Sequence, residues 1–107
     1  MREKAVVQSA GELASIIDRL HDRWFDLNDI RFDKPAATVT IPFSEDGVQL
    51  VIHGANDLRV DDSENIGTYD FNTIKYEPEY RRLTVLTGVP LKLEIEVDTL
   101  LVSLAPM

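Results

Sequence analysis

The amino-acid sequence predicts a mainly β (α+β) domain, in which an N-terminal amphipathic helix packs on an antiparallel β-sandwich or partly open barrel made of two similar meanders. Three observations predict this fold class. Apolar residues near the N-terminus recur with helical spacing, and after them the apolar period changes to two. A nine-residue pattern then occurs twice, 44 residues apart. At 107 residues the chain has the usual length of a single domain, residues 1–107.

The helix is predicted over about residues 9–22. Ser9 and Glu12 have the spacing of a capping box, in which the Ser hydroxyl accepts from an early helical N–H and the Glu reaches back to the cap residue. Apolar residues then form one stripe at three- and four-residue steps: Leu13, Ile16, Ile17, Leu20 and Trp24. Because Trp24 closes this stripe, we expect it to anchor the helix to the sheet in the core.

Two β-hairpins are predicted after the helix. In the first, apolar and polar residues alternate over 39–52, and the connection Ser44–Gly47 ends in a glycine that is free to adopt positive φ. In the second, the same alternation covers 83–97 around the turn Gly88–Pro90. One face of each hairpin should therefore be buried and the other should face solvent.

The most informative pattern is an internal similarity between residues 25–33 and residues 69–77. Three of the nine positions are identical: Asp26 with Asp70, Asn28 with Asn72, and Ile30 with Ile74. Five more positions pair residues of similar chemistry. We interpret the chain as two half-repeats, at about 24–62 and 68–105, each with up to four strands.

Within each copy of the repeated segment the apolar phase slips by one residue, which predicts a bulge or corner in the strand. Asn28 and Asn72 lie at the slip, where an Asn side chain tolerates left-handed backbone. We expect Asp26 and Asp70 to accept hydrogen bonds from backbone N–H groups that the corner exposes. These polar pairs then have structural roles.

Charge and composition exclude several function classes. A net charge of −8 repels nucleic acid and anionic lipid, so neither nucleic acid nor a membrane is an expected partner. The absence of cysteine removes thiol catalysis, Cys-ligated zinc and disulfides. Gln8 and Ser9 interrupt the first apolar run before a secretory segment forms, and no apolar stretch is long enough to span a membrane. Elimination therefore favours the cytoplasm.

No catalytic, cofactor or metal residue is assigned. The acids between Asp26 and Asp33 lack the spacing of a calcium loop. The acidic link at 57–65, which includes Asp61 and Asp62, is a better place for a weak cation or a basic partner, although solvated surface is the preferred interpretation. His21 and His53 have no partner at metal-ligand spacing. A pairing of His21 with a nearby Asp would still need a nucleophile.

Arg81 and Arg82, with Tyr76 and Tyr80 nearby, have two interpretations. Arg and Tyr are enriched where proteins bind one another, so the group could form a recognition patch. Two basic residues at the start of a strand can equally protect a sheet edge against aggregation. We favour the edge interpretation.

Three functions are compatible with these patterns, and a non-enzymatic protein-interaction or assembly module leads. Its partner would be a basic protein, bound more weakly as salt rises, or a second copy, because free sheet edges could pair in a homodimer. The alternatives are a small-molecule-binding β module with a pocket near Trp24, Phe32 and Tyr76, and a hydrolase or isomerase with paired carboxylates. The candidate partner or ligand residues are Trp24, Phe32, Tyr76, Arg81, Arg82, Asp61 and Asp62.

Overall fold

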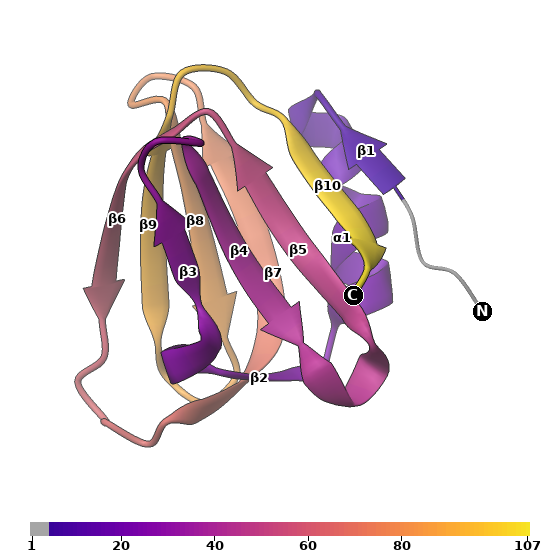
Figure 1. The fold of residues 1–107 in the computed structure, drawn as a ribbon, viewed down its shortest axis with the longest axis vertical. Helices are drawn as coiled ribbons and strands as arrows, with labels where there is room; N and C mark the ends of the chain where they lie inside the picture. Colours follow the sequence, from indigo (N-terminus) through magenta and orange to yellow (C-terminus); the bar gives the residue numbers. More distant parts are fainter. Residues whose placement is uncertain (1–4) are drawn as a thin grey trace.

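The computed structural model describes residues 5–107, which form two five-stranded antiparallel sheets and one short α-helix (Figure 1). The elements in chain order are β1 (Ala5–Val7), η1 (Ala10–Glu12), α1 (Leu13–Leu20), β2 (Trp24–Asp26), η2 (Leu27–Asp29), β3 (Arg31–Asp33), β4 (Thr38–Phe43), η3 (Ser44–Asp46), β5 (Val48–His53), β6 (Ala55–Asp61), β7 (Thr68–Glu77), β8 (Arg82–Thr87), β9 (Lys92–Val97) and β10 (Val102–Pro106). The predicted fold class, a helix on an antiparallel sandwich or partly open barrel, is confirmed.

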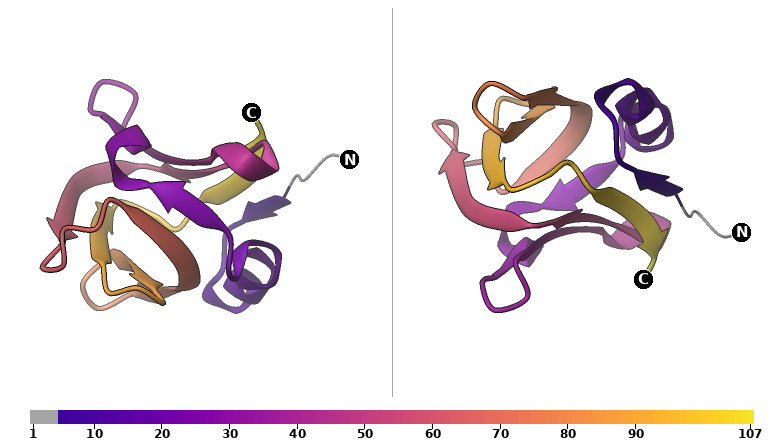
Figure 2. Two further views of the ribbon diagram at one scale, coloured as in Figure 1. Left: turned by 90° about the horizontal axis from the view of Figure 1, so that it is seen from below. Right: turned by 90° about the horizontal axis from the view of Figure 1, so that it is seen from above.

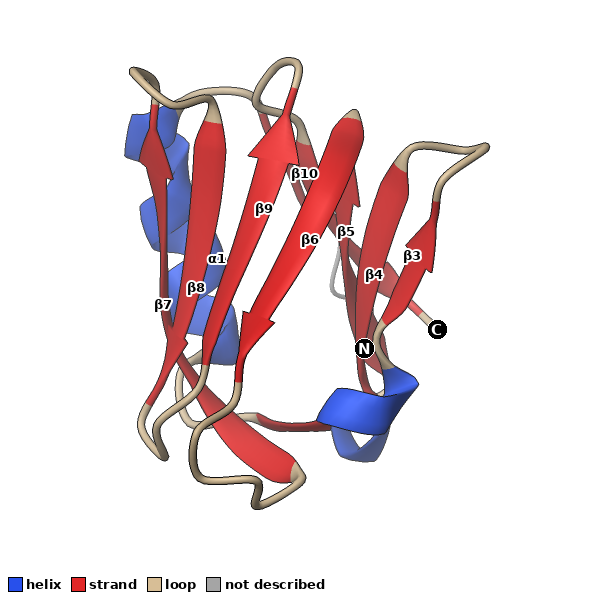
Figure 3. Ribbon diagram, turned by 90° about the vertical axis from the view of Figure 1, so that its left-hand side faces the viewer, coloured by secondary structure: helices blue, strands red, loops and turns tan. Residues whose placement is uncertain are grey.

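The first sheet has the strand order β1-β10-β5-β4-β3, and the second has the order β2-β7-β8-β9-β6 (Figure 3). Both predicted hairpins are present, as β4–β5 and β8–β9. Gly47 closes the first turn with φ +67, a left-handed conformation that costs glycine little. The alternating apolar residues of both hairpins are buried, because they form the inner faces of the two sheets.

The last strand of each half joins the sheet of the other half, which the sequence did not predict. β6 follows β5 in the chain but pairs with β9, while β10 follows β9 but pairs with β5. At the crossing points, Asp98 donates its N–H to the carbonyl of Gly54, at 3.0 Å. Gly54 has φ +66, which lets the chain turn from one sheet to the other. The first sheet therefore combines three strands of the first proposed half with one of the second, and the second sheet combines three strands of the second proposed half with two of the first, β2 and β6.

Strands β2 and β7 pair in a way that relates positions 44 residues apart. Leu27 donates its N–H to the carbonyl of Gly67 at 2.8 Å, and Phe71 donates its N–H to the carbonyl of Arg23 at 2.8 Å. The two donors are separated by the offset of the sequence similarity, and so are the two acceptors. This reciprocal arrangement is what a local two-fold axis between β2 and β7 produces.

Four aromatic rings fill the space between the sheets. The ring of Phe43, on β4, lies edge-on to Phe25 at 5.6 Å and edge-on to Phe71 at 6.1 Å between centroids. Phe25 lies 6.2 Å from Tyr69, its partner in the β2–β7 register. Such edge-to-face contacts add to the stabilisation that burial of the rings provides.

Helix α1 lies beside β7 at one side of the two sheets (Figure 2). Its predicted apolar stripe is confirmed for four residues, since Leu13, Ile16 and Leu20 are buried and Ile17 packs against the core. No helix within residues 5–107 is long and apolar enough to cross a membrane.

The start of the helical segment uses the predicted Ser9–Glu12 pair in a different geometry. Ser9 Oγ donates to Glu12 Oε1 at 2.9 Å, and the same oxygen accepts from the N–H of Gln8 at 3.4 Å. The expected capping box would instead join each side chain to a backbone N–H of the other. The two residues fix the turn before α1, which begins at Leu13.

The prediction that Trp24 anchors the helix in the core is wrong. The helix ends at Leu20, and Asp22 takes a left-handed conformation with φ +67 that turns the chain into β2. On β2 it is Phe25 that points inward and is buried, whereas Trp24 is 44% exposed. The helical spacing of apolar residues therefore extends to Trp24, although the helix itself ends at Leu20.

The predicted corners at Asn28 and Asn72 are confirmed. In the first half, η2 interrupts the strand at Asn28, and in the second half the β7–β8 register shifts at Asn72. Asp26 Oδ1 accepts from the N–H of Asn28 at 2.9 Å, as expected. Asp70 differs, because its Oδ1 accepts from the N–H of Val89 in the β8–β9 turn at 2.8 Å.

We predict that Gly88→Ala destabilises the protein by about 1–3 kcal/mol. An alanine Cβ at this position would lie 2.9 Å from Asp70 Cγ and closer still to Oδ2, and the bond to Val89 holds that carboxylate in place. Denaturant unfolding would measure the change. Gly11→Ala is the matched control, because its added methyl meets no atom within 4 Å. Equal stability of the G88A variant and the wild type would contradict this account.

Candidate functional site

The outer face of the second sheet carries charged and polar residues in rows that cross its strands, and we name it the charged face. Residues opposite one another in adjacent antiparallel strands share a face of the sheet, so the register identifies the rows. The first row is Glu77, Arg82, Glu96 and Asp57, and the second is Lys75, Thr84, Glu94 and Arg59.

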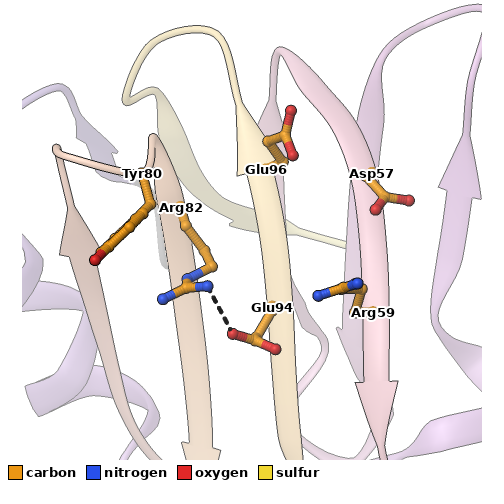
Figure 4. Close-up of a pocket in the computed structure, with 6 residues that line it drawn as sticks. All are labelled: Asp57, Arg59, Tyr80, Arg82, Glu94 and Glu96. Atoms are coloured by element: carbon orange, nitrogen blue, oxygen red, sulfur yellow. Dashed lines mark ion pairs between the residues drawn. The ribbon is translucent and has the colours of Figure 1, made fainter.

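A hollow of about 330 Å³ lies on the charged face (Figure 4). Strands β8, β9 and β6 and the β7–β8 turn form it, so it reaches from the middle of the sheet to its edge. Six residues line it: Asp57, Arg59, Tyr80, Arg82, Glu94 and Glu96. Five of them are charged, and the two signs are mixed.

On the β8 side of the hollow, Arg82 is held from three directions. Its Nη2 lies 3.1 Å from Glu77 Oε1 and its Nη1 lies 3.1 Å from Glu94 Oε2. Its guanidinium also lies over the ring of Tyr80, 5.0 Å from the centroid. Charge-assisted hydrogen bonds and the cation–π contact together fix the side chain, so it forms a rigid part of the surface.

Partial burial tends to raise the pKa of Glu77, but hydrogen bonds from Arg82 and Thr84 and the positive charges of Arg82 and Lys75 outweigh it, so the pKa is lowered from 4.5. Glu77 therefore stays ionised at neutral pH and is a weaker base than an ordinary glutamate. Its role is to hold Arg82.

On the β6 side of the hollow the charges are unpaired. Asp57, Arg59 and Glu96 form no ion pair with any residue in the described range 5–107. Figure 4 shows the Arg59 side chain extending from β6 toward β9. The charged face is thus saturated near β8 and open to a partner's charges near β6.

The structure separates the two arginines of the predicted patch. Arg82 lines the hollow with Tyr80, whereas Arg81 lies in the β7–β8 turn with φ +49 and uses its carbonyl to accept the N–H of Val97 at 2.8 Å. The interpretation that the pair opens an edge strand is wrong, because β8 lies between β7 and β9. Tyr76 packs partly against the core.

The three residues of the predicted small-molecule pocket are not brought together. Trp24 lines a separate depression of about 170 Å³ with Asp26, Asp29 and Glu45 among others. Phe32 is on β3 in the first sheet, 5.8 Å below the ammonium group of Lys34, while Tyr76 is on β7 in the second sheet. Neither Phe32 nor Tyr76 lines the hollow on the charged face, the depression at Trp24 or a further depression at Asp61.

The prediction of an acidic link over 57–65 is wrong for residues 57–61, which belong to β6, and the loop begins at Asp62. Asp62 Oδ1 accepts from the N–H of Asn65 at 3.1 Å and from the hydroxyl of buried Tyr69, which itself accepts from the N–H groups of Ile66 and Gly67. Asp61 lines a third depression, of about 400 Å³, together with Lys92. Within residues 5–107, no group of three or more His, Cys, Asp and Glu side chains could hold a metal ion.

Each histidine side chain contacts a polar side chain of another element. His21 follows the last helical residue, with Nδ1 3.2 Å from Asp22 Oδ2 and Nε2 3.1 Å from Asn72 Oδ1. It therefore ties the end of α1 to the bulge in β7. His53 Nε2 lies 2.9 Å from Ser103 Oγ, across the β5–β10 pair.

Sequence reasoning included Asp57 in the predicted acidic link and missed Arg59 as a functional candidate, although it placed Glu94 and Glu96 on a solvent-facing phase. The alternation along β9 indicates which residues face outward. It does not indicate that β6, from the other half of the chain, pairs with β9 and completes the hollow.

We predict that Glu77→Gln lowers the melting temperature at pH 7 and that the difference from the wild type shrinks as the pH falls. A lowered pKa means that the charged carboxylate stabilises the folded state above pH 4.5, and that this stabilisation is lost as Glu77 becomes protonated. Thermal unfolding at several pH values would measure this. Glu79→Gln, which changes the charge equally in the adjacent turn, is the control. A pH-independent difference would contradict the role of ionised Glu77.

Comparisons with protein-family models, with curated proteins and with solved structures found no match to this chain. The function therefore has to be inferred from the hollow, the charged face and the sheet edge beside them.

Proposed function

We propose that the chain is a non-enzymatic protein-interaction module that binds a strand of a partner protein along the outer edge of β6. The observation that carries this proposal is the length of the edge strands. At the other three sheet edges, β2 and β3 have three residues each and β1 has three within the described range, whereas β6 has seven. Short edges are a common protection against unwanted strand pairing, and a long open edge is a template for it.

The corresponding strand of the first sheet, β10, supports the proposal, because a further strand pairs beside it. Val102 of β10 lies opposite Ile52, and Leu58 of β6 lies opposite Ile95, so the two strands occupy matching positions. Residues 102–104 pair on their other side with β1, whereas residues 58–60, at the offset of the proposed internal repeat, pair there with no strand of the described chain. The proposed repeat thus indicates that a strand fits beside β6.

Exposure of apolar surface also favours an added strand at β6. Val60 is 47% exposed, whereas Leu104, its counterpart on β10, is completely buried. A strand laid along β6 would cover Val60 and provide hydrogen-bond partners for the outward N–H and C=O groups of β6. Both effects stabilise a complex.

The unpaired charges specify the partner's sequence. A strand beside β6 places a side chain opposite each residue of β6, so a cation opposite Asp57 and an anion opposite Arg59 would be favoured. The net charge of −8 favours approach of a basic partner at long range, whereas the strand contact itself depends on the local charges of Asp57 and Arg59. This proposal retains the cytoplasmic location expected from the sequence.

The two alternative functions have less support. A carboxylate-dependent hydrolase needs an acid kept protonated by burial, but Asp57 and Glu96 are exposed and Glu94 is paired with Arg82. Small-molecule sites are mostly apolar, whereas the hollow beside β6 is lined almost entirely by charged residues.

We predict that Val60→Lys reduces capture of a partner from extracts of the native host severalfold relative to the wild type, because a Lys at a strand edge opposes strand addition. Affinity capture followed by quantitative mass spectrometry would measure this. Val6→Lys is the matched control, since Val6 is a valine of similar exposure, 55% against 47% for Val60, on the edge strand β1. Capture by the wild type and by V6K should also weaken as salt rises.

The proposal fails if V60K, with an unchanged circular dichroism spectrum, captures the same proteins as the wild type in the same amounts. It also fails if V6K and V60K reduce capture equally, because the effect would then not depend on β6.

A further inference from the structure

We infer that the strand that pairs with β6 is β6 of a second copy of the chain, so that the protein forms a two-fold symmetric dimer through a continuous sheet. This inference rests on the proposed strand addition at β6 and names its partner. The basis is that the sequence of β6 is complementary to itself in one antiparallel register.

A strand that pairs with its own copy about a two-fold axis has one residue on the axis. With Leu58 on the axis, Asp57 of each copy lies opposite Arg59 of the other, so two opposite-charge pairs form. Leu58 is the middle residue of Ala55–Asp61, so every paired residue in this register belongs to β6.

The neighbouring registers are less favourable. With Arg59 on the axis, Arg59 lies opposite its own copy and Asp57 lies opposite Asp61, and both are like-charge pairs. With Val60 on the axis, Arg59 meets Asp61, but the ladder extends to Asp62, which lies beyond β6 in the link. Of these three registers, only the one centred on Leu58 places opposite charges across from each other with every paired residue inside β6.

The structure also limits where the new ladder begins. The N–H of Ala55 already donates to the carbonyl of Ala37 at 2.8 Å, so this end of β6 is closed. The β6–β9 register also shifts between Ala55 and Asp57, and the Asn56 side chain donates to Asp98 Oδ1 at 2.7 Å. Regular pairing is therefore expected over Asp57–Arg59. In this segment Leu58 would contact Leu58 of the second copy.

The pairing would use the charges that are unpaired in the single chain. Asp57 lies opposite Glu96 of β9, and Arg59 lies opposite Glu94. In the dimer each Arg59 would lie between the carboxylates of Glu94 in its own chain and Asp57 in the other. The hollows of the two copies would then meet along one charged surface that crosses the interface.

The test uses two charge-reversal variants, Arg59→Glu and Asp57→Arg, studied by sedimentation over a range of protein concentrations. Each substitution places like charges opposite each other twice across the axis, so each should raise the dimer dissociation constant by about tenfold or more. Mixing the two variants should form a heterodimer, detected by native mass spectrometry, because each then supplies the charges that the other lacks. The double variant D57R/R59E should self-associate within about threefold of the wild type.

Several results would overturn the inference. The wild type could remain a monomer at every concentration at which it is soluble, or the single variants could dimerise as well as the wild type does. Loss of dimerisation in R59E but not in D57R, without heterodimer formation, would indicate the Val60 register and would also overturn it. Val6→Lys, at the other sheet edge, should leave dimerisation unchanged.

These results are distinguishable from failure of the proposed function. If the wild type is a monomer and Val60→Lys still abolishes capture of another protein, strand addition at β6 stands and the second copy is the wrong partner. If neither self-association nor captured protein depends on β6, both proposals fail.

Discussion

The contact of Phe43 with Phe25 and Phe71 joins the two sheets, and the rest of the structure depends on the apolar layer that it centres. The inner faces of the long strands supply the apolar side chains of this layer. Charged side chains must therefore lie on the outer faces of the sheets, in the turns and at the sheet edges. This division explains why Asp26, Asp62 and Asp70 serve local backbone groups, and why the charged side chains gather on the outside of the second sheet.

The charged face combines a rigid part with an open part. Arg82 is satisfied by Glu77, Glu94 and Tyr80 and provides a fixed surface in the middle of the sheet. Toward the edge, Asp57 and Arg59 are exposed, next to backbone groups that no strand within residues 5–107 pairs. A partner strand added at β6 would contact the exposed backbone groups and the charged side chains together. The backbone hydrogen bonds would fix the orientation of the strand, and the charges would select its sequence.

Local patterns in the sequence predicted local structure well. Alternation over 39–52 and 83–97 depends on neighbouring residues, so it identified both hairpins and their buried faces. The slip at Asn28 and Asn72 predicted the corners for the same reason. Errors arose where tertiary packing decides the structure. Trp24 continued a helical period beyond the helix, and Arg81 and Arg82 were assigned to a sheet edge without knowledge of the strand order. The hollow depends on the pairing of β6 with β9, and a pattern of neighbouring residues cannot predict which distant strands pair.

The exchange of β6 and β10 between the halves has a consequence for synthesis of the protein. β5 and β6 leave the ribosome early, but β5 gains its outer neighbour only when β10, near the C-terminus, has been made. Until then a hydrophobic strand such as Val48–His53 lacks half of its hydrogen bonds, and contacts between distant strands form slowly. Nascent chains of this protein are therefore expected to depend on rapid completion or on chaperones to avoid premature association.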